Sequence, residues 1–141
     1  MIEFTVYGEP VAQGRPRFTA RGGFSKAYDP EPSREYKQYV KLMASQNRPH
    51  TPIEGPVSLT LIIYRPLLKS MSKKKKAAAV AGTLRPIKKP DVDNVAKGIM
   101  DAMTGIIWQD DKQVVDLHVT KFYSDQPRVD IKVIELDEVI P

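Results

Sequence analysis

The feature that most constrains the fold is the segment 57–66, VSLTLIIYRP, in which large aliphatic residues occupy alternate positions. Because successive side chains of a β-strand point to opposite faces, the alternate residues share one face of a strand: Val57, Leu59, Leu61 and Ile63. Ile62 points to the other face and indicates that this face is also partly covered. The segment therefore predicts a strand that is buried on one face and partly buried on the other.

The amino-terminal part predicts a strand and a helix with an irregular stretch between them. Residues 2–8, IEFTVYG, alternate apolar with polar side chains, as in a half-buried strand. Residues 12–32 are interrupted by Gly and Pro, which predicts a long loop, or a ribbon, rich in Arg and aromatic residues. From Ser33 the period becomes helical, with an apolar stripe formed by Tyr36, Tyr39, Val40 and Met43.

The second half of the chain predicts two more helices and two more strands. Residues 72–82, SKKKKAAAVAG, predict a short helix that Ser72 caps and Gly82 ends. After Pro90 a longer helix is expected, followed by Gly105, and its apolar stripe consists of Val92, Val95, Ile99, Met100 and Met103. Residues 114–123 and 128–136 alternate and are joined by SDQP, so they predict a β-hairpin.

This order of elements predicts an α+β fold with a single mixed β-sheet and helices packed on one face. A length of 141 residues, without internal repeats or a linker, indicates one domain over residues 1–141. The chain has no cysteine, which excludes a disulfide framework, a thiolate zinc site and a cysteine nucleophile, and fits a reducing, cytoplasmic location. Neither a signal peptide nor a membrane span is expected.

Positive charge is concentrated in residues 65–89, here called the basic segment. It contains nine basic residues and no acidic one, so the rest of the chain carries −4 of the total net charge of +5. The nine are Arg65, Lys69, Lys73, Lys74, Lys75, Lys76, Arg85, Lys88 and Lys89. Such a segment is typical of a surface that binds a polyanion, although a solvated lysine face is the structural alternative. Because the four consecutive lysines repel one another, we expect the segment to be mobile without a ligand.

Two carboxylates follow the basic segment directly, in residues 88–102, KKPDVDNVAKGIMDA. In one interpretation, Asp93 caps the helix and Asp91 lies in solvent. In the other, both aspartates, with Asn94 beside them, hold a metal ion where a polyanion is delivered. Lys97 lies one helical turn after Asp93, either as a surface ion pair or as a cation that neutralises charge on a phosphate.

Asp110 and Asp111 supply two more carboxylates just before a predicted strand. An Asp-Asp pair is common in turns, but a strand that enters beside the helix start would bring one of them to Asp91 and Asp93. Close carboxylates repel one another, and a bound Mg²⁺, or Mn²⁺ in its place, would remove that repulsion. This constellation predicts metal-assisted phosphodiester hydrolysis.

Competing motifs are absent. A calcium-binding EF-hand loop that started at Asp91 would need Gly and Glu where the chain has Ala96 and Ala102. The sequence contains none of the patterns GxxxxGK[ST], GxGxxG, GxSxG and HExxH. The interpretations as a P-loop protein, a dinucleotide-binding protein or a serine hydrolase therefore lose their main support.

Residues 89–117, KPDVDNVAKGIMDAMTGIIWQDDKQVVDL, resemble the signature of the RusA family of Holliday junction resolvases. The shared pattern is D-x-D-N-x-x-K, then D-A, then D-D-x-Q-V. GEPVAQGRPRF and SKKKKAA also resemble the Gram-positive and phage branch of the family, so the gene would be bacterial or carried by a phage or prophage. The stretch between Asp101 and the D-D pair is one residue shorter than in the usual pattern.

The resemblance implies a RusA-like, Mg²⁺-dependent endonuclease that cuts four-way DNA junctions as a homodimer. By motif position, Asp91, Asp93 and Asp111 match the catalytic, metal-binding carboxylates and Lys97 matches the catalytic lysine. Asp110 ranks behind Asp111 as a metal ligand. A two-fold symmetric dimer suits a junction that needs two opposed cuts.

The expected DNA contacts lie in the basic segment and in residues 12–32. The phosphate-binding candidates are Arg15, Arg17, Arg21, Lys73, Lys74, Lys75, Lys76, Lys88 and Lys89. Phe18 or Phe24 would stack on a base, although a solvated loop whose aromatic tips pack on the domain is a nearly equal alternative. Two other functions stay open: a metal-dependent nuclease for other branched or flap DNA, and a DNA-binding module without catalysis. No membrane partner is expected.

Overall fold

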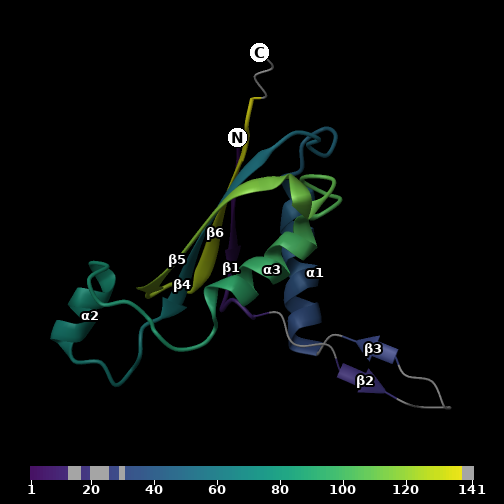
Figure 1. The fold of residues 1–141 in the computed structure, drawn as a ribbon. Coiled ribbons are helices and arrows are strands. Elements are labelled where there is room, and N and C mark those ends of the chain that lie inside the picture. Colours follow the sequence, from purple (N-terminus) through teal and green to yellow (C-terminus); the bar gives the residue numbers. More distant parts are fainter. Residues whose placement is uncertain (13–16, 20–25, 29–30, 138–141) are drawn as a thin grey trace.

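The computed structural model describes residues 1–12, 17–19, 26–28 and 31–137. A four-stranded sheet carries two helices on one side and a third helix beyond one end (Figure 1). The elements of the four-stranded sheet are β1 (Ile2–Tyr7), β4 (Val57–Pro66), β5 (Val114–Ser124) and β6 (Arg128–Glu135). The helices are α1 (Glu31–Gln46), α2 (Lys73–Val80), α3 (Val92–Met103) and the short 3₁₀ helix Asp111–Gln113. A separate two-stranded ribbon consists of β2 (Arg17–Thr19) and β3 (Lys26–Tyr28), which confirms the ribbon alternative.

The strand order is β1-β6-β4-β5, and it corrects one sequence-based expectation. The strands β5 and β6 do not form a hairpin, because β4 lies between them: it pairs in parallel with β5 and antiparallel with β6. β6 also pairs antiparallel with β1. The short SDQP connection therefore crosses over the end of β4 instead of closing a hairpin.

The burial of β4 explains its central place. Val57, Leu59, Leu61 and Ile63 are all fully buried, as the alternation predicted. They face the same side as the buried residues of β1 and β6, for example Phe4 and Ile131, which lie in register with Leu61 across the sheet. A strand that presents so much aliphatic surface is most stable with a neighbouring strand on both edges and helices over one face.

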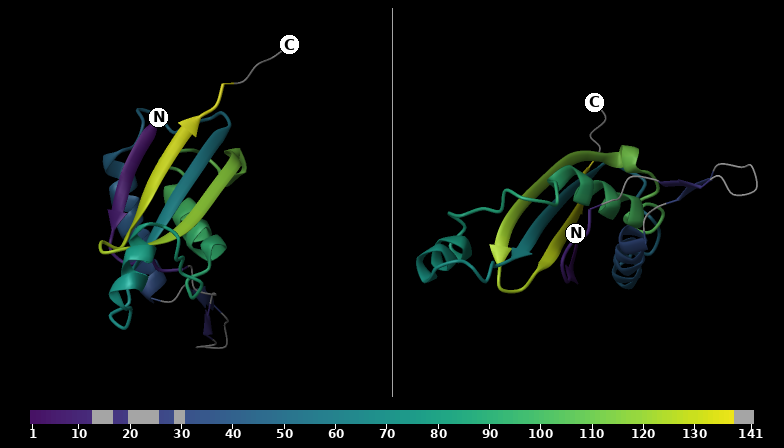
Figure 2. Two further views of the ribbon diagram at one scale, coloured as in Figure 1. Left: turned by 90° about the vertical axis from the view of Figure 1, so that its left-hand side faces the viewer. Right: turned by 90° about the horizontal axis from the view of Figure 1, so that it is seen from below.

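The helices α1 and α3 cover this buried face of the sheet, and Figure 2 shows both on the same side of it. Val40 and Ala44 of α1 and Val95, Ile99 and Met103 of α3 are fully buried in the shared core. The α+β class and the single mixed sheet with helices on one face are thus confirmed for the core. The helix α1 starts two residues earlier than expected, with Pro32 in its first turn, where proline is tolerated.

The basic segment contains the short helix that the sequence predicts. Ser72 caps α2, and its hydroxyl oxygen accepts a hydrogen bond of 3.2 Å from the Lys75 N–H. Gly82 follows the helix with a φ of 85°, a left-handed conformation that favours glycine. The helix lies beyond the ends of β4 and β5 and away from α1 and α3 (Figure 1). In the described ranges, no helix has the length and apolarity needed to cross a bilayer.

The central role of β4 generates a stability prediction. Leu61→Ala should lower the free energy of unfolding by about 2–5 kcal/mol, because it leaves a cavity in the core. Leu42→Ala on α1 is the matched control: Leu42 is 56% exposed, so its truncation should change stability by about 0.5 kcal/mol or less. Urea denaturation followed by circular dichroism measures both values. Equal losses for the two variants would contradict the central placement of β4.

Candidate active site

The Asp91 carboxylate at the start of α3 does not cap the helix. Asp91 occupies the N-cap position, yet its side chain makes no capping hydrogen bond, and Asp93 lies inside the first turn. The expectation that Asp93 caps the helix is therefore wrong. Both aspartates are exposed, and within the described part of the chain neither carboxylate has an ion pair. Both are free to take a ligand, and each also gains from the positive end of the helix dipole.

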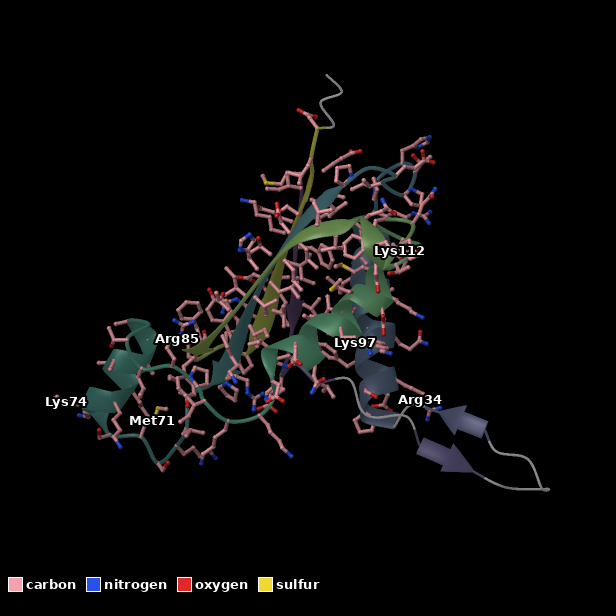
Figure 3. The ribbon with its side chains drawn as sticks, viewed as in Figure 1. Arg34, Met71, Lys74, Arg85, Lys97 and Lys112 are labelled. Atoms are coloured by element: carbon pink, nitrogen blue, oxygen red, sulfur yellow. The ribbon has the colours of Figure 1, made fainter. Side chains whose placement is uncertain are left out.

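Lys97 lies one turn after Asp93 on the exposed side of α3. Among the ion pairs of the described residues, none joins Lys97 to Asp93, so the surface-pair interpretation has no support. Figure 3 shows Lys97 on the face of α3 that is open to solvent. The ammonium group is therefore available to a ligand that approaches the same face.

Asp93 and Lys97 line a groove of about 460 Å³ between α3 and β5. Asp101 and Asp111 also line it, and Met100, Leu117 and Val119 supply apolar surface. Asp101 is engaged elsewhere, because its Oδ2 lies 3.6 Å from the Lys37 Nζ of α1. The groove thus has an apolar floor and carries charged groups at intervals along its length.

Asp111 is held by two side chains that precede it. Its Oδ1 accepts a hydrogen bond from the Thr104 hydroxyl and one of 3.2 Å from the Trp108 indole N–H. The Trp108 N–H also lies 3.2 Å from the Thr104 Oγ1. Trp108 is fully buried, and its indole N–H also orients a carboxylate. Thr104 was not among the expected site residues, and nothing in its sequence context distinguishes it from an ordinary helix end.

The neighbouring residues of the D-D-x-Q pattern build the turn. The Asp110 carboxylate caps the 3₁₀ helix and accepts a hydrogen bond of 2.9 Å from the Lys112 N–H. Gln113 closes a capping box, and its amide donates to the carbonyls of Ile53, at 2.6 Å, and Gly55, at 3.0 Å. The turn is thereby fixed to the segment before β4, and Asp111 rather than Asp110 lines the groove.

The carboxylates do not come together within one chain. The sequence had predicted that Asp110 or Asp111 would lie beside Asp91 and Asp93. Asp111 is hydrogen-bonded to Thr104 at the far end of α3. Thr104 lies eleven positions after Asp93, a helix rise of roughly 16 Å at 1.5 Å per residue. In the described ranges, no cluster of three or more His, Asp or Glu residues can hold a metal ion. The parallel pairing of β4 and β5 causes the separation, because α3 has to run back along the sheet before β5 begins.

The predicted DNA contacts fall in three places. Lys73, Lys74, Lys75 and Lys76 are exposed on α2, and Lys88 and Lys89 are exposed just before Pro90 and Asp91. Arg17 belongs to β2, whereas Arg15, Arg21 and Phe24 lie outside the described residues. The last lysines of the basic segment thus lie next to the carboxylates in the sequence.

Comparisons with known proteins show the family of the chain. The family model described as "Endodeoxyribonuclease RusA" matches residues 7–134. A protein of Bacillus subtilis (strain 168), described as "Uncharacterized protein YqaN", is 57% identical over 137 residues, which cover 96% of each chain. The family match spans both long helices, the carboxylates, β4, β5 and nearly all of β6, and it begins at the last residue of β1. The chain belongs to the RusA endodeoxyribonuclease family.

Proposed function

We propose that this protein is a Mg²⁺-dependent endonuclease that resolves four-way DNA junctions in recombination and repair. The observation that carries the proposal is the pair of exposed carboxylates, Asp91 and Asp93, which cap nothing and follow the basic segment directly. Membership of the RusA family supports nuclease activity on DNA junctions. The basic segment would bind phosphates of the DNA, and the carboxylates would hold the metal ion at the phosphate that is cleaved.

The residues at the start of α3 fit a magnesium ion. Mg²⁺ prefers oxygen ligands, keeps several waters and is usually bound by one or two carboxylates together with substrate phosphates. Asp91 and Asp93 offer such a pair, and Asn94 is exposed beside them. When bound, the ion would polarise the scissile phosphate and activate a water molecule. Mn²⁺ shares this preference for oxygen ligands and would serve as a substitute.

The other residues of the groove would position the substrate. Lys97 would hold a phosphate oxygen and offset the negative charge that develops during cleavage. Lys88 and Lys89 would contact the backbone on the approach to Asp91. Asp111, held by Thr104 and Trp108, would present its second carboxylate oxygen to the site. Asp110 remains a weaker metal candidate because its carboxylate already caps a turn.

A homodimer would complete this site. Since one chain keeps Asp111 roughly a helix length from Asp93, a second copy placed with its α3 reversed would bring Asp111 of one chain to Asp91 and Asp93 of the other. Two-fold symmetry would then create two equivalent sites. A four-way junction, which has to be cut in two opposed strands, matches that number of sites.

Other branched or flap DNA is the alternative substrate, and a module that binds without cutting is the third possibility. Among the described residues, Asp91, Asp93 and Lys97 form no ion pair, and the Asp91 side chain makes no capping bond; this favours catalysis over mere binding. Incubation with labelled junction, flap and duplex DNA, in Mg²⁺ or in EDTA, separates the three. The proposal expects paired cuts in the junction with Mg²⁺; preferred cutting of flaps, or binding without cutting, would contradict it.

The metal ligands generate the first functional prediction. Asp91→Asn, Asp93→Asn and Asp111→Asn should each abolish cleavage and leave junction binding unchanged or tighter, because each removes a metal ligand charge that also repels DNA. Asp116→Asn, at an exposed position of β5, is the control and should cut normally. Cleavage assays and gel shifts in EDTA measure the two effects. A variant that cuts at nearly the wild-type rate would remove that residue from the site.

The lysines of α2 generate the second functional prediction. Replacement of Lys73, Lys74, Lys75 and Lys76 by Ala should weaken binding to all DNA forms, since phosphate contacts do not depend on sequence. Each lost contact should reduce the slope of log affinity against log salt by about 0.9. Lys132→Ala, on β6, should leave the slope unchanged. Fluorescence anisotropy across a salt series gives both slopes, and an unchanged slope for the α2 variant would mean that these lysines only face solvent.

Lys97 generates the third functional prediction. Lys97→Ala should reduce cleavage by about 10²–10³, the usual effect of losing one group that stabilises transition-state charge. Its melting temperature should stay close to wild type, because the side chain is exposed and makes no ion pair among the described residues. Lys97→Arg should restore little, since a planar guanidinium is not a compact point charge.

Single-turnover cleavage of a bound junction separates the chemistry from binding. Lys41→Ala, an exposed lysine of α1, is the control. A Lys97→Ala rate within about threefold of wild type corresponds to less than about 1 kcal/mol of barrier and would exclude the catalytic role.

A further inference from the structure

The connection between α2 and α3 is tied to the sheet by one residue of β5. Residues 81–90 contain no helix or strand, and Asp91 follows them. Lys121 reaches this connection from β5, and its Nζ donates hydrogen bonds to the carbonyl oxygens of Lys88, at 2.8 Å, and Pro90, at 3.0 Å. The Arg85 Nε donates in return to the Lys121 carbonyl, at 2.7 Å.

These three bonds are the hydrogen bonds that residues 85–90 make to other elements in the described part of the chain. A further contact comes from Arg85, whose guanidinium lies 3.7 Å from the centre of the Phe122 ring. Figure 3 shows Arg85 between α2 and the sheet. The position of the loop before Asp91 therefore depends on Lys121 and its neighbour in β5.

The Lys121 side chain lies on the same face of the sheet as the groove. Its register partner in β4 is Ile63, which is fully buried under the helices. Val119, two residues earlier on the same face of β5, lines the groove. Lys121 thus continues this row of side chains toward the end of the groove where Asp91 begins α3.

We propose that Lys121 is a positioning residue for the Asp91 carboxylate, in addition to the family motif. The Pro90 carbonyl belongs to the peptide plane that carries the Asp91 N–H, so a hydrogen bond to this oxygen fixes the plane from which Asp91 projects. The Lys88 carbonyl fixes the previous turn of the loop in the same way. An ammonium group can hold both carbonyls because it has three donors and accepts nothing. Since the Asp91 side chain makes no capping bond, these backbone contacts orient it.

The inference rests on the proposed metal role of Asp91, and its test reads metal binding directly. Lys121→Met keeps the length and apolar stem of the side chain but cannot donate. Mn²⁺ binding to the free protein, followed by electron paramagnetic resonance, should weaken by about 10- to 100-fold, as is usual when a group that orients a metal ligand is lost. The Mg²⁺ concentration for half-maximal junction cleavage should rise by a similar factor, and junction affinity in EDTA should stay within about threefold of wild type.

Lys132→Met is the matched control. Lys132 also lies in a strand, but its Nζ is 3.8 Å from Glu3 on the opposite face of the sheet. It should change neither the Mn²⁺ affinity nor the Mg²⁺ requirement. Hydrogen exchange adds a readout that needs no metal: in Lys121→Met, amides of residues 85–97 should exchange faster while those of β1 and β6 remain protected.

The outcomes separate the two proposals. If wild-type protein binds no Mn²⁺ and cuts no DNA, the proposed function is wrong. If wild-type protein does both and Lys121→Met has the same Mn²⁺ affinity, Mg²⁺ requirement and exchange, the positioning role is wrong. A lower melting temperature with an unchanged Mg²⁺ midpoint would also contradict it. If Lys121→Met does not fold, Lys121→Gln replaces it, because its shorter side chain cannot hold both carbonyls. A wild-type Mg²⁺ midpoint together with wild-type exchange in that variant would overturn the proposal.

Discussion

The parallel pairing of β4 with β5 is the constraint on which the rest of the structure depends. Parallel neighbours cannot be joined by a tight turn, because the chain has to return from the end of one strand to the start of the next. The return path here is residues 67–113, and it contains α2, the connection before Asp91, α3 and the turn with Asp111. Nearly every residue of the proposed site therefore belongs to one crossover connection, which joins β4 to β5.

The same crossover explains why the carboxylates are far apart. Asp91 starts the returning helix, and Asp111 follows its far end, so the length of α3 sets their separation. The sheet holds each end separately. Lys121 of β5 binds the backbone before Asp91, whereas Gln113 binds the carbonyls of Ile53 and Gly55 beside Asp111. The two halves of the proposed metal site are thus attached to the sheet at different places in one chain, which is why we propose that a second copy brings them together.

The sequence predicted the local structure well, because the relevant interactions are local. The helix from Ser72 to Gly82 and the one that ends before Gly105 follow from caps and apolar stripes. The order of the strands could not be predicted in the same way. Two alternating segments joined by SDQP have the same local pattern whether they pair with each other or accept β4 between them. The insertion depends on contacts between residues more than fifty positions apart, such as Leu61 with Ile131.

In the candidate site, too, the local sequence pattern was predictive and the long-range contacts were not. The D-x-D-N-x-x-K and D-D-x-Q patterns predicted Asp91, Asp93, Lys97 and Asp111 as site residues, but not that Thr104 binds Asp111. The local pattern also does not reveal that the indole N–H of the buried Trp108 donates a hydrogen bond to Asp111. Lys121 lies 31 residues from the carbonyl of Pro90, so no spacing rule connects them.

The central claim is that each metal site is built from Asp91 and Asp93 of one chain and Asp111 of another. The most direct measurement is cleavage by a heterodimer of Asp91→Asn and Asp111→Asn chains, purified through two different affinity tags. Each variant homodimer should be inactive, whereas the heterodimer should contain one complete site and nick the junction in one strand at a time. Recovery of Mg²⁺-dependent nicking is the result that the account predicts. A heterodimer as inactive as either homodimer would contradict it and place the site within a single chain.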